Sequence, residues 1–201
     1  MKGACWLSLS LLALNAQAAD AYRLDADHTS VSFDIRRFGI PWVGAHFRQF
    51  SGDFVVDRNG GDSHVDVTVR TDSIEGLSAG WSLRLRSSDW LDTQRFPEMR
   101  FRSSHVEFDS NGGALASGQL MLHGITRPVT LHVLRLDCGG ERTLPDQPCG
   151  FSAHADIRRS DFGLPHGFWL AGDQVEISVS GAALRNARRL VSASAAAPMG
   201  N

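Results

Sequence analysis

Hydrophobic and polar residues alternate with a period of two along most of the chain. Such alternation is typical of half-buried β-strands, because successive side chains of a strand point to opposite faces of the sheet. The sequence therefore predicts an all-β chain between about residues 22 and 184. The clearest alternating runs contain Val31-Phe33-Ile35, Val65-Val67-Val69, Val106-Phe108 and Val175-Ile177-Val179.

Turn-forming residues lie between these runs. Arg58–Gly61 and Ser110–Gly113 each contain Asn-Gly-Gly, and such residues tolerate the positive φ angles of tight hairpins. A further break at Gly124 separates alternating leucines from alternating valines and leucines, which predicts two strands that meet at a turn. Pro128 lacks an N–H, so we expect it at the entry of the second strand rather than in its middle.

One segment interrupts the alternation. Over Ser82–Phe96 the apolar residues follow no clean period, so we expect a short helix or an irregular loop that ends before Pro97. Ser87 and Ser88 precede Asp89 and are candidates for the N-cap of such a helix.

Regularly spaced short strands with this punctuation favour a β-barrel or a β-sandwich. Phe38, Phe47 and Phe54 lie among Gly39, Gly44 and Gly52, and glycines in strands often mark the bends that a barrel needs. An eight-stranded barrel either fills its interior with side chains or encloses a ligand, and the strand pattern alone does not distinguish the two.

The N-terminus has the three parts of a secretory signal peptide. Lys2 is the positive residue, Ala4–Leu14 is the apolar stretch, and Ala16-Gln17-Ala18 fits the cleavage site. The apolar stretch is too short to span a bilayer. We therefore expect export to the periplasm and the following organisation: a signal peptide at 1–18, one domain at 19–184 and a disordered tail at 185–201.

Cys138 and Cys149 are the cysteines that remain after such cleavage. They flank a Gly- and Pro-rich stretch, and in an oxidising compartment we expect them to form a disulfide that closes this loop. A redox or metal-binding pair is the alternative, but the spacing does not match CxxC. The formal charge of −2 argues against nucleic-acid binding, which relies on a dense cationic surface.

Catalytic and metal-binding patterns are weak. Gly76–Gly80 reads GxSxG, the motif of a hydrolase nucleophile, but that motif requires a strand-to-helix turn in an α/β fold. The histidines form neither HxH nor HExxH, and we expect His28 and His123 to anchor turns through hydrogen bonds. We expect no catalytic residue, no metal and no cofactor, with an esterase that uses Ser78 as an alternative.

Three separated phrases resemble the YceI-like family of periplasmic polyisoprenoid-binding proteins. They are YRLDADHTSVSFDI at Tyr22–Ile35, LHGITRPVTL at Leu122–Leu131 and ADIRRSDFGLP at Ala155–Pro165. The resemblance implies an antiparallel, lipocalin-like β-barrel of about eight strands with one short helical excursion. The chain departs from the family at Arg37-Phe38-Gly39 and at Gly80-Trp81-Ser82, and these departures bear on the choice of ligand.

The resemblance implies the binding, transport or sequestration of a polyisoprenoid or similar amphiphilic lipid in an apolar barrel cavity. A solid barrel that serves a membrane redox or stress system is the alternative. Either function allows transient contact with a membrane or a membrane protein, and the sequence does not determine the oligomeric state. Arg159 fills the arginine position of the family motif and, with Arg158, is a candidate for contact with a lipid head group. The candidate cavity residues, chosen for size and strand parity, are Phe33, Ile35, Phe38, Trp42, Phe47, Phe54, Leu85, Trp90 and Phe101.

Overall fold

The computed structural model describes residues 19–37, 40–58, 62–138, 148–164 and 172–186. Within these ranges, eleven strands form a single antiparallel sheet, with one α-helix and three short 3-10 helices. The strands are β1 (Asp20–Leu24), β2 (Ser30–Arg37), β3 (Ile40–Phe47), β4 (Phe50–Val56), β5 (His64–Arg70), β6 (Ile74–Gly76), β7 (Glu98–Phe108), β8 (Ala114–Leu122), β9 (Ile125–Leu136), β10 (Cys149–Arg158) and β11 (Gln174–Arg185). The helices are η1 (Ala26–His28), η2 (Thr71–Ser73), α1 (Ala79–Arg86) and η3 (Arg159–Phe162).

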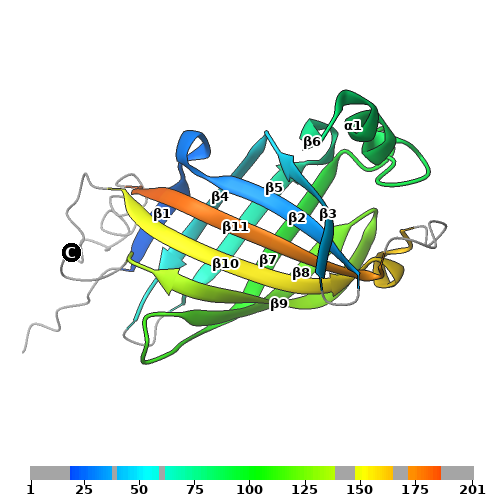
Figure 1. Ribbon diagram of the computed structural model, residues 1–201. Helices are drawn as coiled ribbons and strands as arrows, with labels where there is room; N and C mark the ends of the chain where they lie inside the picture. Colours follow the sequence, from blue (N-terminus) through cyan, green and yellow to red (C-terminus); the bar gives the residue numbers. More distant parts are fainter. Residues whose placement is uncertain (1–18, 38–39, 59–61, 139–147, 165–171, 187–201) are drawn as a thin grey trace, which may run out of the picture.

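Eight of the strands close into a barrel, which confirms the predicted fold. Their order is β1-β4-β5-β7-β8-β9-β10-β11, and β1 pairs with β11 to complete the ring. The remaining strands β2, β3 and β6 extend the sheet from β11 at the end of the barrel that carries α1 (Figure 1).

Strand β11 pairs with both β1 and β2 along the same edge, because η1 separates these two strands in the chain. Val175–Ser180 pairs with β2, whereas Ala183–Arg185 pairs with β1. Helix η1 joins β1 to β2 at this point and lies against Gly181. A Cβ at Gly181 would collide with the His28 carbonyl and the backbone of the next residue, so the close approach requires glycine.

The turn between β8 and β9 lies where the sequence predicts it. His123 and Gly124 have φ angles of 51° and 73°, as a two-residue hairpin turn requires. Pro128, however, lies inside β9 rather than at its entry. Among the described residues Pro128 pairs with β8 alone, through Gln119, so its missing N–H falls in a stretch that is paired on one side only.

The helical excursion begins earlier than the sequence suggests. Ser78, not Ser87 or Ser88, is the N-cap of α1, and its hydroxyl accepts a hydrogen bond from the Trp81 N–H at 3.2 Å. Ser87 instead lies at the C-cap. The helix buries Leu85 against the barrel core. Among the described residues, no helix is long and apolar enough to cross a membrane.

The outer face of the barrel carries an ionic cluster. Arg100 and Arg102 on β7 donate hydrogen bonds to Asp66 on β5, with N–O distances from 2.7 to 3.1 Å. The hydrogen bond from Arg100 is the main reason why the pKa of Asp66 falls from 3.8 to about 2, and Arg102 adds to it. This arginine pair therefore belongs to a solvated strand face.

Candidate functional site: a hollow apolar barrel

The interior of the barrel contains space that side chains do not fill. The larger part, here called the large chamber, is a cavity of about 120 Å³. Every described residue that lines it is apolar. Its walls come from strands of the barrel proper and include Phe54, Val67, Phe101, Val106, Phe108, Ala116, Val129, Leu131, Val133, Phe151, Ala155 and Val179.

A second space, here called the small chamber, lies toward α1 and η3. It is a cavity of about 50 Å³. Among the described residues that line it, Arg159 is charged and the others are apolar. The other lining residues are Phe33, Ile35, Phe47, Leu85, Trp90, Leu91, Met99, Leu122, Ile157, Leu164, Val175 and Ile177.

The two chambers share part of their walls. Met99 on β7 and Ile177 on β11 line both of them. The two side chains therefore mark the place where one chamber adjoins the other along the barrel. Methionine is unbranched and adapts its shape readily, so a chain-like ligand could pass between the chambers at this point.

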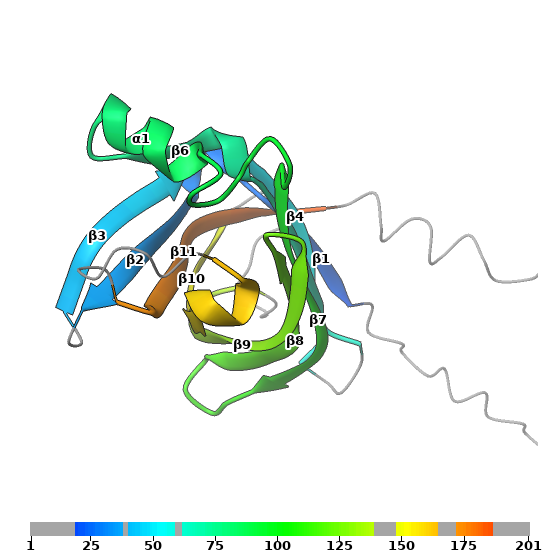
Figure 2. The same ribbon diagram turned by 90° about the vertical axis from the view of Figure 1, so that its right-hand side faces the viewer.

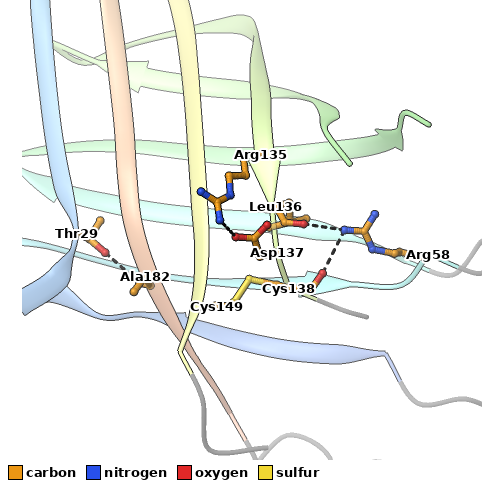
Figure 3. Close-up of a disulfide and its surroundings, with 8 residues drawn as sticks. All are labelled: Thr29, Arg58, Arg135, Leu136, Asp137, Cys138, Cys149 and Ala182. Carbon is orange, nitrogen blue, oxygen red and sulfur yellow. Dashed lines mark hydrogen bonds and ion pairs between the residues drawn. A yellow bond between two sulfur atoms is a disulfide. The ribbon is translucent and has the colours of Figure 1, made fainter. Parts of the chain in front are cut away.

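The disulfide end of the barrel carries a cluster of buried residues. Cys138 and Cys149 form the predicted disulfide between β9 and β10, and both are buried. Tyr22 is fully buried beside them and stacks on Phe54. The Arg58 guanidinium donates hydrogen bonds to the carbonyls of Leu136 and Cys138 at 3.1 and 3.2 Å (Figure 3). This end therefore holds its geometry through a covalent bond and through backbone contacts.

Arg159 is the polar feature of the interior. Its side chain is 4% exposed, its Nε donates to the Gly172 carbonyl at 3.1 Å, and its guanidinium lies 5.6 Å from the centre of the Trp90 ring. Burial lowers the pKa of the Arg159 guanidinium, and the Asp173 carboxylate opposes this change. An arginine stays charged under such conditions, so the small chamber presents a cation to any group inside it.

Helix η3 holds Arg159 in place at the α1 end of the barrel (Figure 2). The Arg159 N–H donates to the Asp173 carbonyl at 2.9 Å, and the Ser160 side chain donates to the Asp173 carboxylate at 2.8 Å. Phe162 is buried in the core below, and Gly163 ends the helix in the left-handed conformation. These contacts fix the position of η3.

One part of the barrel wall lacks backbone pairing. Strands β9 and β10 pair from Leu136–Phe151 to His132–His154, and the pairing of the described residues ends there. Residues 125–131 of β9 continue beside β8 alone, and residues 155–158 of β10 continue beside β11 alone. The outer surface between these unpaired stretches has a hollow of about 290 Å³, here called the side opening.

The candidate cavity residues can now be placed. Five of them line the small chamber, and two line the large chamber. Phe38 and the side chain of Trp42 fall outside the described residues. Contact of any of these residues with a ligand stays a prediction. The five residues at the small chamber are Phe33, Ile35, Phe47, Leu85 and Trp90, and the two at the large chamber are Phe54 and Phe101.

The valines of the large chamber were not among the candidates. Val67, Val106, Val133 and Val179 lie on its walls, although the candidate list favoured larger side chains. Their alternation had already marked them as one face of each strand. The candidate arginines also separate, because Arg159 points into the small chamber whereas Arg158 is exposed and lines the side opening.

The remaining candidates have local roles. The Ser78 hydroxyl caps α1, as described above. His28 makes a 2.8 Å contact with Asp25, and His123 lies 3.3 Å from the Phe162 carbonyl oxygen, so each contributes to a turn or helix end. His132 and His154 stack on the outer wall with ring centres 5.2 Å apart. The described residues contain no group of three side chains that could hold a metal ion.

The fold and its interior define a class: a hollow, antiparallel eight-stranded barrel with an apolar lumen and one buried cation. The YceI-like domain family matches residues 22–183 of the chain. Protein YceI of Escherichia coli O17:K52:H18 (strain UMN026 / ExPEC) is 33% identical over 181 residues, which are 89% of this chain and 93% of that protein. The chain belongs to the YceI-like family.

A further relative and a solved structure are also similar to this chain. UPF0312 protein VPA0850 of Vibrio parahaemolyticus serotype O3:K6 is 34% identical over 157 residues, which cover 77% of this chain and 82% of that protein. The crystal structure of Burkholderia cenocepacia BcnA has the same fold, with a TM-score of 0.68 at 21% identity over 79% of this chain and 98% of that chain.

A second solved structure has the same architecture at lower similarity. The polyisoprenoid binding domain from Saccharophagus degradans gives a TM-score of 0.54 at 13% identity, over 84% of this chain and all of that chain. This likeness concerns the fold.

Proposed function

We propose that this protein binds a long-chain amphiphilic lipid of the polyisoprenoid type, non-covalently, inside the barrel. The observation that carries the proposal is the pair of adjoining apolar cavities inside the barrel. Protein interiors are close-packed, so two adjoining apolar spaces are more readily explained by a ligand than by a poorly packed core. Removing apolar area from water contributes about 25 cal/mol per Å², which favours a long flexible tail.

The large chamber suits the tail of such a lipid, because its lining offers no polar group. The small chamber suits the polar end, because the Arg159 guanidinium can form paired hydrogen bonds to phosphate or carboxylate oxygens. The polyisoprenoid-binding relative from Saccharophagus degradans supports this ligand class. The disulfide fits the periplasm that the N-terminal sequence indicates, because disulfides persist in oxidising compartments.

A pair of neighbouring substitutions tests the proposal. Val133 lines the large chamber, whereas Leu134 beside it is 65% exposed on the outer face of β9. We expect Val133→Asp to reduce saturable uptake of a polyprenyl lipid about tenfold, because the new carboxylate removes apolar surface and is itself desolvated. Leu134→Asp is the matched control and should bind normally.

Uptake of a dansyl-labelled farnesyl lipid is measured by the quenching of the protein's tryptophan fluorescence. Near-UV circular dichroism confirms that each variant folds. Equal uptake by folded Val133→Asp and by Leu134→Asp would contradict binding in the large chamber. A wild-type protein with no saturable uptake would contradict the proposed function as a whole.

A further inference from the structure

The side opening raises the question of how a ligand passes between the interior and the outer surface. It lies between β9 and β10, where the described strands run past the end of their mutual pairing. Its lining combines Arg127, Thr130 and Arg158 with apolar residues. This hollow lies over a wall segment in which the described parts of β9 and β10 are not paired with each other.

Two side chains connect this surface to the interior. Val129 lines both the side opening and the large chamber, and Ile157 lines both the side opening and the small chamber. A single layer of side chains therefore separates the outer surface from each chamber. Side chains change rotamer far faster than paired strands separate, so such a layer can open without loss of the sheet.

The unpaired segment has a cause in the strands themselves. The register between β9 and β10 shifts at Ser152 and Ala153, and a bulge of this kind bends a strand and can terminate its pairing. Pro128 cannot donate to a neighbouring strand and lies in the same stretch. The two features together keep β10 from closing on β9 beyond His154.

Side-chain contacts close the outer end of this segment. Arg127 on β9 donates from Nε to the Asp161 carbonyl at 3.0 Å, and His123 contacts the Phe162 carbonyl. The first contact joins β9 to η3, and the second joins the β8–β9 turn to η3, which follows β10 in the chain. A few side-chain hydrogen bonds are weaker than a ladder of backbone pairs, so this link can be released at low cost.

We propose that the lipid enters and leaves the barrel sideways, through the side opening between the unpaired parts of β9 and β10. This inference rests on the proposed function, because it concerns the exchange of the same ligand. The tail passes between Val129 and Ile157 into the large chamber, and the polar end follows into the small chamber toward Arg159.

A cross-link across the opening provides the test. If the ladder continued past His154, Thr130 would lie opposite Asp156, and both residues line the outer hollow. Thr130→Cys/Asp156→Cys is joined with bis(maleimido)ethane in a background with Cys5→Ser, where the remaining cysteines are held in the disulfide. The control is Ser152→Cys/Ser180→Cys, a pair that already faces across the β10–β11 ladder.

The readout is release of the dansyl-labelled farnesyl lipid from loaded protein to phosphatidylcholine vesicles. We expect the cross-link to slow release about tenfold or more when it is formed after loading, and to slow uptake similarly when it is formed before loading. The linked control should exchange within about twofold of the unlinked protein. Equal exchange by linked and unlinked Thr130→Cys/Asp156→Cys would overturn the proposal.

An opening variant gives a second and independent result. Arg127→Gln removes the guanidinium contact with the Asp161 carbonyl, and we expect release about threefold faster with the same amount of lipid bound. An unchanged release rate would count against the side opening. Absence of saturable uptake by the unlinked protein would instead overturn the proposed function, so the two failures are distinguishable.

Discussion

The large and small chambers adjoin one another but offer a ligand different chemistry. The large chamber is apolar throughout and ends at a disulfide. The small chamber carries Arg159 and ends at two short helical segments. The binding free energy that an apolar wall contributes depends on the buried area of the ligand and not on a particular chemical group. A buried cation, in contrast, discriminates between polar groups. Under the proposed function, we expect tail length and head-group identity to be recognised by different parts of one barrel.

The largest expected effect comes from breaking the covalent closure of the large chamber. Cys138→Ser/Cys149→Ser should lower the free energy of unfolding by about 2–3 kcal/mol, because the open loop gains conformational entropy in the unfolded chain. Arg58→Met, which removes two hydrogen bonds at the same end, should cost about 1 kcal/mol. Urea denaturation measures both. Equal stability of the double serine variant and the native chain would show that the disulfide does not hold this end.

Filling the large chamber should affect long tails selectively. Ala116 is buried on its wall, and Ala116→Trp should weaken octaprenyl binding about thirtyfold, or ~2 kcal/mol. Geranyl binding should change less, because a short tail needs less of the space. Ser117→Trp places the same side chain on the opposite face of β8 and serves as the control in equilibrium titrations. Equal losses for both tails would contradict the assignment of tail length to this chamber.

Removing the buried cation should affect head groups selectively. Arg159→Met keeps an unbranched side chain but removes the charge, and we expect about tenfold weaker binding of a prenyl phosphate. Binding of the matching neutral prenol should stay within about twofold. Arg158→Met, at the exposed neighbour, should alter neither affinity. Isothermal titration with the two lipids decides the question, and parallel losses would remove Arg159 from head-group recognition.

The smallest expected effect concerns the outer wall, where charge serves stability rather than binding. The pKa of Asp66 is lowered from 3.8 to about 2, so its stabilising contribution is present above about pH 4 and is lost as the pH falls toward 2. Asp66→Asn should cost under about 1 kcal/mol at pH 7, since the group is partly exposed. The difference from the native chain should vanish near pH 2 in pH-dependent urea denaturation. Asp62→Asn is the exposed control, and a pH-independent difference for Asp66→Asn would contradict the ionic cause.

Much of the barrel could be predicted from the sequence, because the alternation of apolar and polar residues indicates which side chains of each strand face the interior. The hairpin at Gly124 and the disulfide between Cys138 and Cys149 are local or nearly local features, and the structure contains both. The helix start at Ser78 was missed because Gly76–Gly80 also matched a hydrolase motif and no single-residue signal distinguishes a cap from a nucleophile.

The interior depended on contacts that a sequence pattern does not contain. The burial of Arg159 arises from η3 folding back toward Asp173, and the exposure of its neighbour Arg158 follows from the alternation at the same place. The side opening lies next to a register shift at Ser152 and Ala153. The sequence contains no pattern that predicts this shift, although Pro128 indicates weaker pairing in the same part of β9. The prediction of cavity residues favoured large aromatic side chains. The walls of the large chamber also include many valines, whose positions follow from strand pairing.

The central claim is that the barrel holds a lipid rather than a filled core. Native mass spectrometry of the protein purified from the periplasm, followed by organic extraction of the bound material, tests it most directly. We predict a one-to-one adduct whose extracted lipid has a polyisoprenoid tail. A mass equal to that of the protein alone, unchanged after incubation with polyprenyl lipids, would contradict the account.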